Sequence, residues 1–196
     1  MFANRFTAII DACTLVDTLK RNLLLTLAEA GFFRLRWSGP ILDETEAAID
    51  GILRKKGRAD AADRAKRARA SMEAAFEDAM VTDFDIFLPA AAGLPDPDDA
   101  HVVAAAIKTQ AAMIVTENLK DFPAAILDTL DIEAKPADEF IADTIALDEG
   151  RAVAAIRRMR ERFEKPEMTA EALLLSMEAT GLVEAVNLLR PHVESL

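Results

Sequence analysis

The amino-acid sequence predicts an α/β fold, a three-layer sandwich around a parallel sheet, followed by an all-helical annex. Over the first 138 residues, short apolar runs rich in β-branched residues, such as residues 6–10, alternate with longer amphipathic segments. Strands that alternate with helices pair in parallel. From residue 139 onward only helical periodicity is left. We therefore expect residues 1–138 to form the sheet-containing domain and residues 139–196 to form a helical extension.

The composition describes an acidic chain of 196 residues with a net charge of −11. Hydrophobic residues make up 52% of it, which is enough for the core of one domain with a small annex. The acidic balance argues against binding nucleic acid through bulk charge alone, but a local basic patch is compatible with it. The single cysteine, Cys13, excludes an internal disulfide and metal sites built on paired cysteines.

The sequence contains no signal for membrane insertion or export. No apolar run reaches the roughly 18 residues that a membrane span requires. The N-terminus lacks the charged-then-apolar pattern of a signal peptide. We therefore expect a cytoplasmic protein that does not associate with membranes.

The first half of the chain is expected to supply three strands and the helices between them. We expect strands at residues 6–10, within 32–37 and within 83–88, and helices at 16–30, from 41 to 53, and at 72–80. Ser38 suits the N-cap of the second of these helices, and Gly31 suits the end of the first. Glu44 lies on the flank of the helix that Ser38 begins.

The second half begins with a helix start that organises the rest of the site. Asp96 suits the N-cap and Pro97 the first helical position, while Asp99 lies in the first turn, where the helix dipole favours negative charge. Further along, we expect strands at 113–115 and 132–134, a helical turn within 123–130, and helices at 138–147, 149–163, 170–180 and from 182 to about 189. Asp138 and Thr169 suit N-caps, and Pro166 suits a helix break.

Carboxylates fall at several points where the top edge of the sheet is expected. Asp11 directly follows the first strand, Asp121 follows the fourth, Asp99 opens the buried face of its helix, and Glu44 can lean over the same edge. Oxygen ligands without histidine or cysteine suit Mg²⁺ or Mn²⁺. Two alternatives stay open, because Asp11 is also a suitable helix N-cap and Glu44 alone is typical of a solvated helix residue.

A basic segment stands out in this acidic chain. Residues 54–69 carry eight basic side chains opposed by only two acids. Such an excess suits contact with a phosphate backbone, and a solvated helix face explains it equally well. The basic residues are Arg54, Lys55, Lys56, Arg58, Arg64, Lys66, Arg67 and Arg69.

Four blocks of the sequence resemble a PIN domain, the nuclease fold of the VapC toxins of bacterial toxin–antitoxin pairs. The subgroup usually labelled "toxin component, PIN family" is similar in all four, and they occur in family order between residues 8 and 123. The helical annex also resembles one attached to some members of this subgroup. The blocks are Ile10–Cys13, Arg36–Glu44, Leu94–Ile107 and Ile114–Pro123.

The resemblance implies a parallel sheet of strand order 3-2-1-4-5 and a metal-dependent endoribonuclease, the toxin of a type II toxin–antitoxin pair. Hydrolysis of the RNA phosphodiester would proceed by in-line attack of metal-activated water, with Mg²⁺ or Mn²⁺ as cofactor. The implied partners are the RNA substrate and a cognate antitoxin. The oligomeric state is left open, a homodimer being one alternative.

The resemblance also assigns roles to individual residues. Asp11, Glu44 and Asp99 take the positions of the first three catalytic, metal-binding acids. Most PIN domains carry Asp where Asn118 stands, so Asn118 is a neutral metal ligand at best and Asp121 is expected to supply the fourth charge. Thr116, at the family's hydroxyl position, and Asp96 are expected to support the site. Cys13 stands where Ser or Asn is commoner.

Three other functions are compatible with parts of this pattern. The Asp11-x-x-Thr14 start resembles that of haloacid-dehalogenase phosphatases, but those need a second Asp where this chain has Cys13. The second alternative is a degenerate, non-catalytic PIN domain that binds protein or RNA, because Asn118 replaces an acid. The third is a nuclease of the same mechanism whose substrate is DNA.

Overall fold

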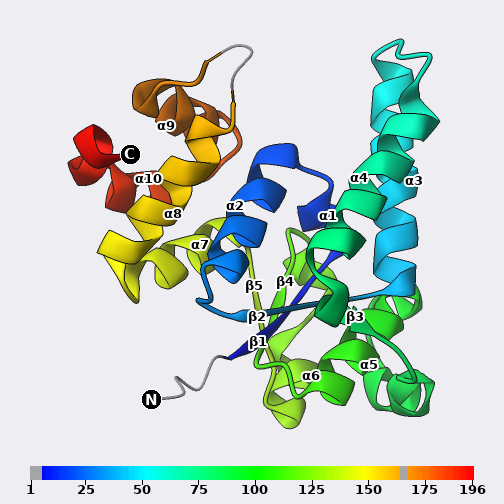
Figure 1. Ribbon diagram of the computed structural model, residues 1–196. Coiled ribbons are helices and arrows are strands. Elements are labelled where there is room, and N and C mark those ends of the chain that lie inside the picture. Colours follow the sequence, from blue (N-terminus) through cyan, green and yellow to red (C-terminus); the bar gives the residue numbers. More distant parts are fainter. Residues whose placement is uncertain (1–5, 164–166) are drawn as a thin grey trace.

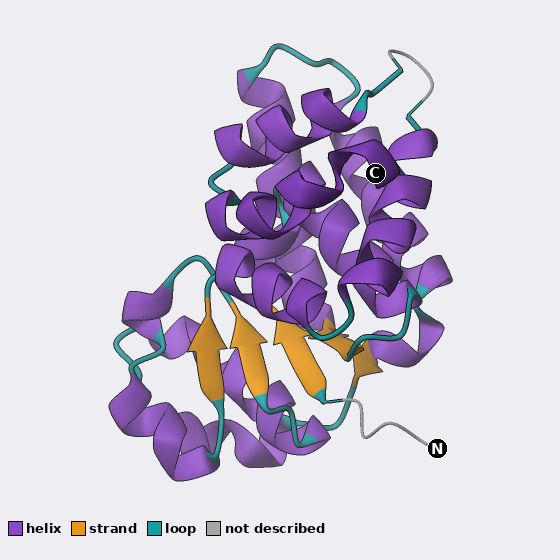
Figure 2. Ribbon diagram, turned by 90° about the vertical axis from the view of Figure 1, so that its left-hand side faces the viewer, coloured by secondary structure: helices purple, strands orange, loops and turns teal. Residues whose placement is uncertain are grey.

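The computed structural model describes residues 6–163 and 167–196 and contains a sheet of five parallel strands (Figure 1). The strands are β1 (Thr7–Ile10), β2 (Arg34–Ser38), β3 (Met80–Val81), β4 (Met113–Val115) and β5 (Glu133–Lys135). Their order is β3-β2-β1-β4-β5, and every neighbouring pair is parallel. The expected parallel sheet of order 3-2-1-4-5 is therefore confirmed. Figure 2 shows the arrowheads on the same side of the sheet, so the carboxyl ends of the strands form one edge.

Helices cover both faces of the sheet. Helix α5 contacts β1, β2, β3 and β4, whereas α2 and α3 contact β2. Helices α7 and α8 in turn contact α2 (Figure 1). The helices are α1 (Ala12–Leu15), α2 (Thr18–Glu29), α3 (Gly39–Lys55), α4 (Ala61–Ala75), α5 (Ala100–Thr109), α6 (Ala124–Leu127), α7 (Ala137–Ala146), α8 (Glu149–Glu161), α9 (Ala170–Ala179) and α10 (Val183–Leu189). No helix among residues 6–163 and 167–196 is both long and apolar enough to cross a lipid bilayer.

The central strand is buried on both of its faces. Ala8, Ile9 and Ile10 have no exposed surface. Strands with helices on both faces read as continuous apolar runs rather than as alternating ones. The run at residues 6–10 therefore occupies the middle of the sheet, and Asp11 emerges at its carboxyl end.

The helical extension shares the core of the sheet-containing part. Phe140 of α7 lies edge-on to Phe33 at a centroid distance of 4.9 Å and to Phe6 at 5.9 Å. The guanidinium of Arg151 in α8 lies 4.1 Å from the centre of the Phe32 ring. Buried apolar residues of both parts form a single cluster. The proposed division at residues 138 and 139 falls in the first turn of α7.

The prediction for the third strand was wrong by a few residues. Residues 83–88 were expected to form it, but β3 is Met80–Val81 and a 3₁₀-helix spans Asp85–Ala91. Asp83 has a left-handed φ of 56°, which ends the extended backbone after β3, and the chain turns into the 3₁₀-helix instead of continuing as a strand. The helix expected over residues 72–80 likewise ends earlier, at Ala75.

Two helix starts also differ from the expectation. The helix expected over residues 16–30 begins at Thr18, because Asp17 caps α2 by accepting hydrogen bonds from the backbone N–H of Leu19 and Lys20, and a separate short helix, α1, precedes it. Asp138 does not cap α7, which follows Pro136. Its carboxylate instead accepts from the backbone N–H groups of Glu184 and Ala185 at the start of α10. Pro166 lies outside the described residues.

Candidate active site

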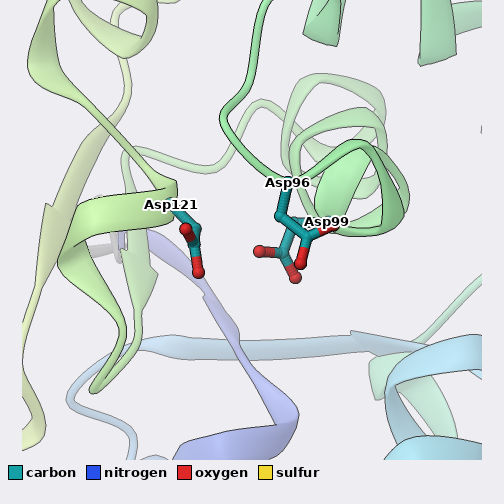
Figure 3. A group of neighbouring side chains, drawn as sticks. All are labelled: Asp96, Asp99 and Asp121. Carbon is teal, nitrogen blue, oxygen red and sulfur yellow. The ribbon is translucent and has the colours of Figure 1, made fainter.

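Three aspartate carboxylates gather beyond the carboxyl end of β4 (Figure 3). One oxygen of each of Asp96, Asp99 and Asp121 lies within 4.8 Å of the others. Asp96 precedes the 3₁₀-turn η3 (Pro97–Asp99) that leads into α5, and Asp99 ends it. Asp121 ends the turn η4 (Leu119–Asp121) that follows β4, and only 9% of it is exposed. Two segments distant in the sequence therefore deliver acids to one place.

The start of α5 explains why Asp96 and Asp99 lie together. Asp96 Oδ1 accepts a hydrogen bond of 3.0 Å from the backbone N–H of Asp98, which fixes the turn as expected for an N-cap. Residues three apart in a helical turn lie on the same face. The sequence analysis gave Asp96 only a supporting role, although its spacing from Asp99 contained the signal that both face the same way.

Asp11 is a buried carboxylate held by several donors. Its Oδ1 accepts from the backbone N–H of Ala12 at 2.7 Å, and its Oδ2 accepts from Thr116 Oγ1 at 2.7 Å and from Cys13 Sγ at 3.0 Å. Only 5% of Asp11 is exposed. Asp11 thus caps α1 and also borders the cluster, so the two alternatives for this residue are not exclusive. Thr116 also accepts from the backbone N–H of Asn118.

Asn118 lies against Asp121. Its Nδ2 donates a hydrogen bond to Asp121 Oδ2. The amide therefore orients the neighbouring carboxylate, which a second aspartate at this position could not do without protonation. The idea that Asn118 ligates a metal stays a prediction.

Glu44, on α3, lies near enough for its charge to act on Asp99, but it is not one of the three acids whose oxygens lie within 4.8 Å of one another. A histidine contacts its carboxylate. Glu44 Oε1 lies 2.9 Å from Nε2 of His101, which is in the first turn of α5, two residues after Asp99. The Glu44 side chain is about half exposed and that of His101 is mostly buried. Sequence patterns could not reveal this contact, because the two partners are 57 residues apart.

The electrostatics of the site connect all five acids. Burial, followed by the negative charges of Asp11, Asp96, Asp121 and Glu44, raises the pKa of Asp99 to about 6. No Lys or Arg of the described residues lies within ion-pair distance of any of these five carboxylates. The cluster is therefore a site of uncompensated negative charge.

The single cysteine belongs to the wall of this site. Cys13 Sγ lies 3.3 Å from Thr116 Oγ1 and accepts from the backbone N–H of Glu117 at 3.2 Å. Burial of the thiol and then the negative charge of Asp11 raise the pKa of Cys13 to about 11. The protonated thiol can therefore donate to Asp11 and is a poor nucleophile.

The loop after β4 is tied to the helical extension through Glu117. Glu117 Oε1 lies 3.0 Å from Nζ of Lys20 in α2 and accepts from the backbone N–H of Ala137 at 3.3 Å. Ala137 is the first residue of α7, where a carboxylate is favoured by the helix dipole. The extension thus helps to fix the loop that carries Thr116, Asn118 and Asp121.

The basic segment forms the end of the α3–α4 hairpin, which projects beyond the sheet (Figure 1). Some of its charges are already paired: Arg54 contacts Asp50, and Arg58 and Arg64 contact Asp60. Four further basic residues are exposed and have no acid within ion-pair distance among the described residues. These are Lys55, Lys56, Lys66 and Arg67.

A largely apolar groove begins beside the acid cluster, at Cys13. It has a volume of about 720 Å³ and lies between α2, α3 and the region around α9. Side chains from all three walls line it, among them Leu19, Ile49, Ile52, Phe163, Met168 and Lys56. The groove therefore brings the helical extension and the sheet-containing part together next to the site.

The donor set of the cluster suits a hard divalent cation. All ligand atoms are carboxylate oxygens, with no histidine or cysteine sulfur among the three gathered acids. Mg²⁺ and Mn²⁺ prefer such ligands, and a bound cation would offset the mutual repulsion of these carboxylates. The residues present thus fit the metal that the sequence led us to expect.

Comparisons with known proteins match both parts of the chain. A family model described as "PIN domain" matches residues 7–120, and one described as "VapC50 C-terminal domain" matches residues 137–191. A Mycobacterium tuberculosis protein named "Putative ribonuclease VapC50" is 40% identical over 76 residues. That match covers 39% of this chain and 45% of the relative, so the chain spans less than half of the relative's length in the alignment. No solved structure gave a match.

Proposed function

The chain belongs to the PIN domain family, and on that premise we propose that it is a metal-dependent endoribonuclease and the toxin of a type II toxin–antitoxin pair. The observation that carries the proposal is the cluster of Asp96, Asp99 and Asp121, which has no lysine or arginine within ion-pair distance among the described residues. Carboxylates that lie this close together repel one another, and a cation bound among them removes that repulsion. The name of the Mycobacterium tuberculosis relative supports an RNA substrate.

In the proposed site, Mg²⁺ or Mn²⁺ would be held by Asp99 and Asp121 with Asp96, Asp11 and Glu44 around them. When bound, such an ion lowers the pKa of water and offsets the charge that develops on a phosphodiester. The products would be a 5′-phosphate and a 3′-hydroxyl.

The other residues of the site position these acids. Thr116 and Cys13 donate to Asp11 Oδ2 and hold this carboxylate in one orientation. Asn118 does the same for Asp121. Positioned groups contribute because they need no rearrangement when charge develops in the transition state.

We propose that RNA contacts the exposed end of the α3–α4 hairpin. Lys55, Lys56, Lys66 and Arg67 are available there as phosphate contacts. Arg54, Arg58 and Arg64 can contribute if RNA phosphates replace their present carboxylate partners. An acidic protein can bind a polyanion in this way through a local patch while its bulk charge repels it.

The second proposed partner is the cognate antitoxin. Its segment would lie across the acid cluster and over α2 and α3, where the apolar groove lined by Leu19, Ile49 and Ile52 offers a surface for apolar side chains. A toxin of this kind should slow growth when it is expressed alone, and co-expression of the gene product encoded next to it should restore growth. If expression alone is harmless while the purified protein cuts RNA, a housekeeping nuclease is the better description.

A non-catalytic binding module is the second candidate, favoured by Asn118 at a position where an acid is usual. One experiment separates the two: single-stranded RNA and DNA are incubated with the protein in Mn²⁺, in Mg²⁺ and in EDTA. The proposal predicts cleavage of RNA with either ion and none in EDTA. Mn²⁺ should also raise the Tm, and Asp11→Asn should abolish this rise. Absence of cleavage and of a Mn²⁺-dependent Tm would favour the binding module.

A further inference from the structure

Glu44 differs from the other acids of the site in how it is held. Asp11, Asp96 and Asp121 each accept a hydrogen bond from a neighbour on their own segment. Glu44 lies on the side of a long helix and is about half exposed, and among the described residues His101 is the one side chain that forms a hydrogen bond or ion pair with it. A free glutamate side chain samples many rotamers, and fixing one of them costs conformational entropy. The contact with His101 is therefore the polar interaction that restrains the Glu44 carboxylate.

The surroundings of the histidine ring determine which nitrogen carries the proton. A carboxylate can only accept, so Nε2 must donate to Glu44 Oε1. The Nδ1 atom is buried and has no hydrogen-bond partner among the described residues. A hydrogen on Nδ1 would be a buried donor without an acceptor, which is costly. These surroundings place a hydrogen on Nε2, which donates to Glu44.

We propose that His101 is a positioning residue that fixes Glu44 through Nε2, so that Glu44 and Asp99 present their carboxylates to the same cation. Because His101 follows Asp99 by two residues at the start of α5, one rigid turn sets the position of both acids. The His101 hydrogen bond uses Oε1 and leaves Oε2 for the ion. This inference rests on the proposed metal site and adds to it a residue that touches neither the cation nor RNA.

The test compares variants that keep or remove the donor. In His101→Gln, the amide NH₂ can reach about as far as Nε2 and should still donate to Glu44. In His101→Asn the amide is too short to reach, and in His101→Leu there is no donor. His192→Leu is the matched control, because His192 Nε2 forms a similar 3.0 Å contact with Glu149 in the helical extension, away from the site.

The main readout is Mn²⁺ affinity, measured by electron paramagnetic resonance of the free ion. His101→Leu and His101→Asn should weaken Mn²⁺ binding by about 10-fold or more, as removal of outer partners of metal ligands usually does. His101→Gln should restore most of the affinity, and His192→Leu should bind as the wild type. In RNA cleavage, kcat should fall while KM stays unchanged. The double variant with Glu44→Gln should be no worse than Glu44→Gln alone, because His101 acts through Glu44.

The outcomes separate the two proposals. If the wild type binds Mn²⁺ and His101→Asn binds it equally well, or if His101→Gln is as weak as His101→Asn, the positioning role is wrong and the nuclease proposal stands. If the wild type itself neither binds Mn²⁺ nor cleaves RNA, the proposed function is wrong and the role of His101 falls with it. Should His101→Leu fail to fold, the two amide variants still give the comparison.

Discussion

The aspartates and glutamates at the sheet edge and those of the α3–α4 hairpin differ in whether an arginine lies beside them. In the hairpin, Arg69 contacts Asp43, Glu46 and Glu73, and Arg64 contacts Asp60. The hydrogen bond from Arg64 lowers the pKa of Asp60. At the sheet edge, no such partner exists among the described residues, and the pKa of Asp99 is raised to about 6.

This difference matches the different roles that we propose for the two groups of acids. Surface carboxylates that only solubilise or cap helices are readily paired with arginine, as the hairpin demonstrates. The carboxylates at the sheet edge are brought together from separate segments and left unpaired, which costs stability unless a cation binds. The account therefore predicts that substitutions in the two groups will have effects of different size and even of opposite sign.

The largest expected effect is on catalysis. Asp99→Asn should lower kcat for RNA cleavage by at least about 100-fold, because it removes a ligand of a cation that stabilises the transition state by several kcal/mol. Glu73→Gln, which removes an acid paired with Arg69, should leave kcat unchanged. Equal losses in the two variants, measured with one RNA substrate in Mn²⁺, would mean that the unpaired state of Asp99 has no special role.

The next effect concerns RNA affinity. Replacing Lys55, Lys56, Lys66 and Arg67 with Gln should raise KM without changing kcat, because these unpaired charges are proposed to contact phosphates. Each lost contact should reduce the slope of log affinity against log salt by about 0.7. Arg157→Gln, on α8 and paired with Glu161, serves as the control and should not alter the slope. A salt dependence that is the same in all proteins would argue against the hairpin as the RNA surface.

A substitution at Asn118 should increase the repulsion among the carboxylates at the sheet edge. Asn118→Asp replaces the donor to Asp121 with another negative charge. The metal-free protein should then melt at a lower temperature than the wild type, and the rise in Tm caused by Mn²⁺ should be larger. Differential scanning fluorimetry in EDTA and in Mn²⁺ measures both. A smaller Mn²⁺ shift than in the wild type would show that Asn118 is better as it stands.

The smallest effect is the pH dependence of stability without metal. Because the pKa of Asp99 is about 6 in the folded protein and 3.8 ordinarily, the folded state binds this proton more tightly than the unfolded chain does. The resulting stabilisation is fully present below the ordinary value and is lost as the pH rises through about 6. In EDTA near pH 7.5, Asp99→Asn should therefore melt higher than the wild type, and the difference should close toward pH 4.

The paired acid should behave in the opposite sense. The pKa of Asp60 is lowered, so its contribution is present above the ordinary value and is lost as the pH falls. Asp60→Asn should melt slightly lower than the wild type near pH 7.5. Thermal melts over this pH range check both signs, and a Tm for Asp99→Asn below that of the wild type near pH 7.5 would contradict the account of uncompensated charge.

Much of the fold follows from local sequence patterns. The strands around Ile9, Trp37 and Ile114 were predictable because apolar runs between helices must be buried, and the caps at Ser38 and Thr169 were predictable from their hydroxyl groups. The third strand was not, since a two-residue strand has almost no pattern of its own. The role of Asp138 could not be foreseen either, because its partners in α10 are far away in the sequence.

The site was predictable to a similar degree. The sequence predicted that Asp11, Glu44, Asp99 and Asp121 would meet, and Asp99 and Asp121 do lie together, with Asp96 as the third member of the group. Asp11 and Glu44 are not in that group, and the role of each acid stays a prediction from the family resemblance. The contacts that orient them were not predictable. His101 reaches Glu44 across 57 residues, and Thr116 reaches Asp11 across 105, so only the folded chain reveals these partners.

The most direct measurement is the position of Mn²⁺ in crystals of the protein soaked with the ion, found by anomalous scattering. The account predicts a peak in contact with the carboxylates of Asp99 and Asp121, with Asp96, Asp11 or Glu44 completing the ligands, and no such peak in Asp99→Asn crystals. Fully soaked crystals without a peak among these acids, or with one only at the hairpin acids, would contradict it.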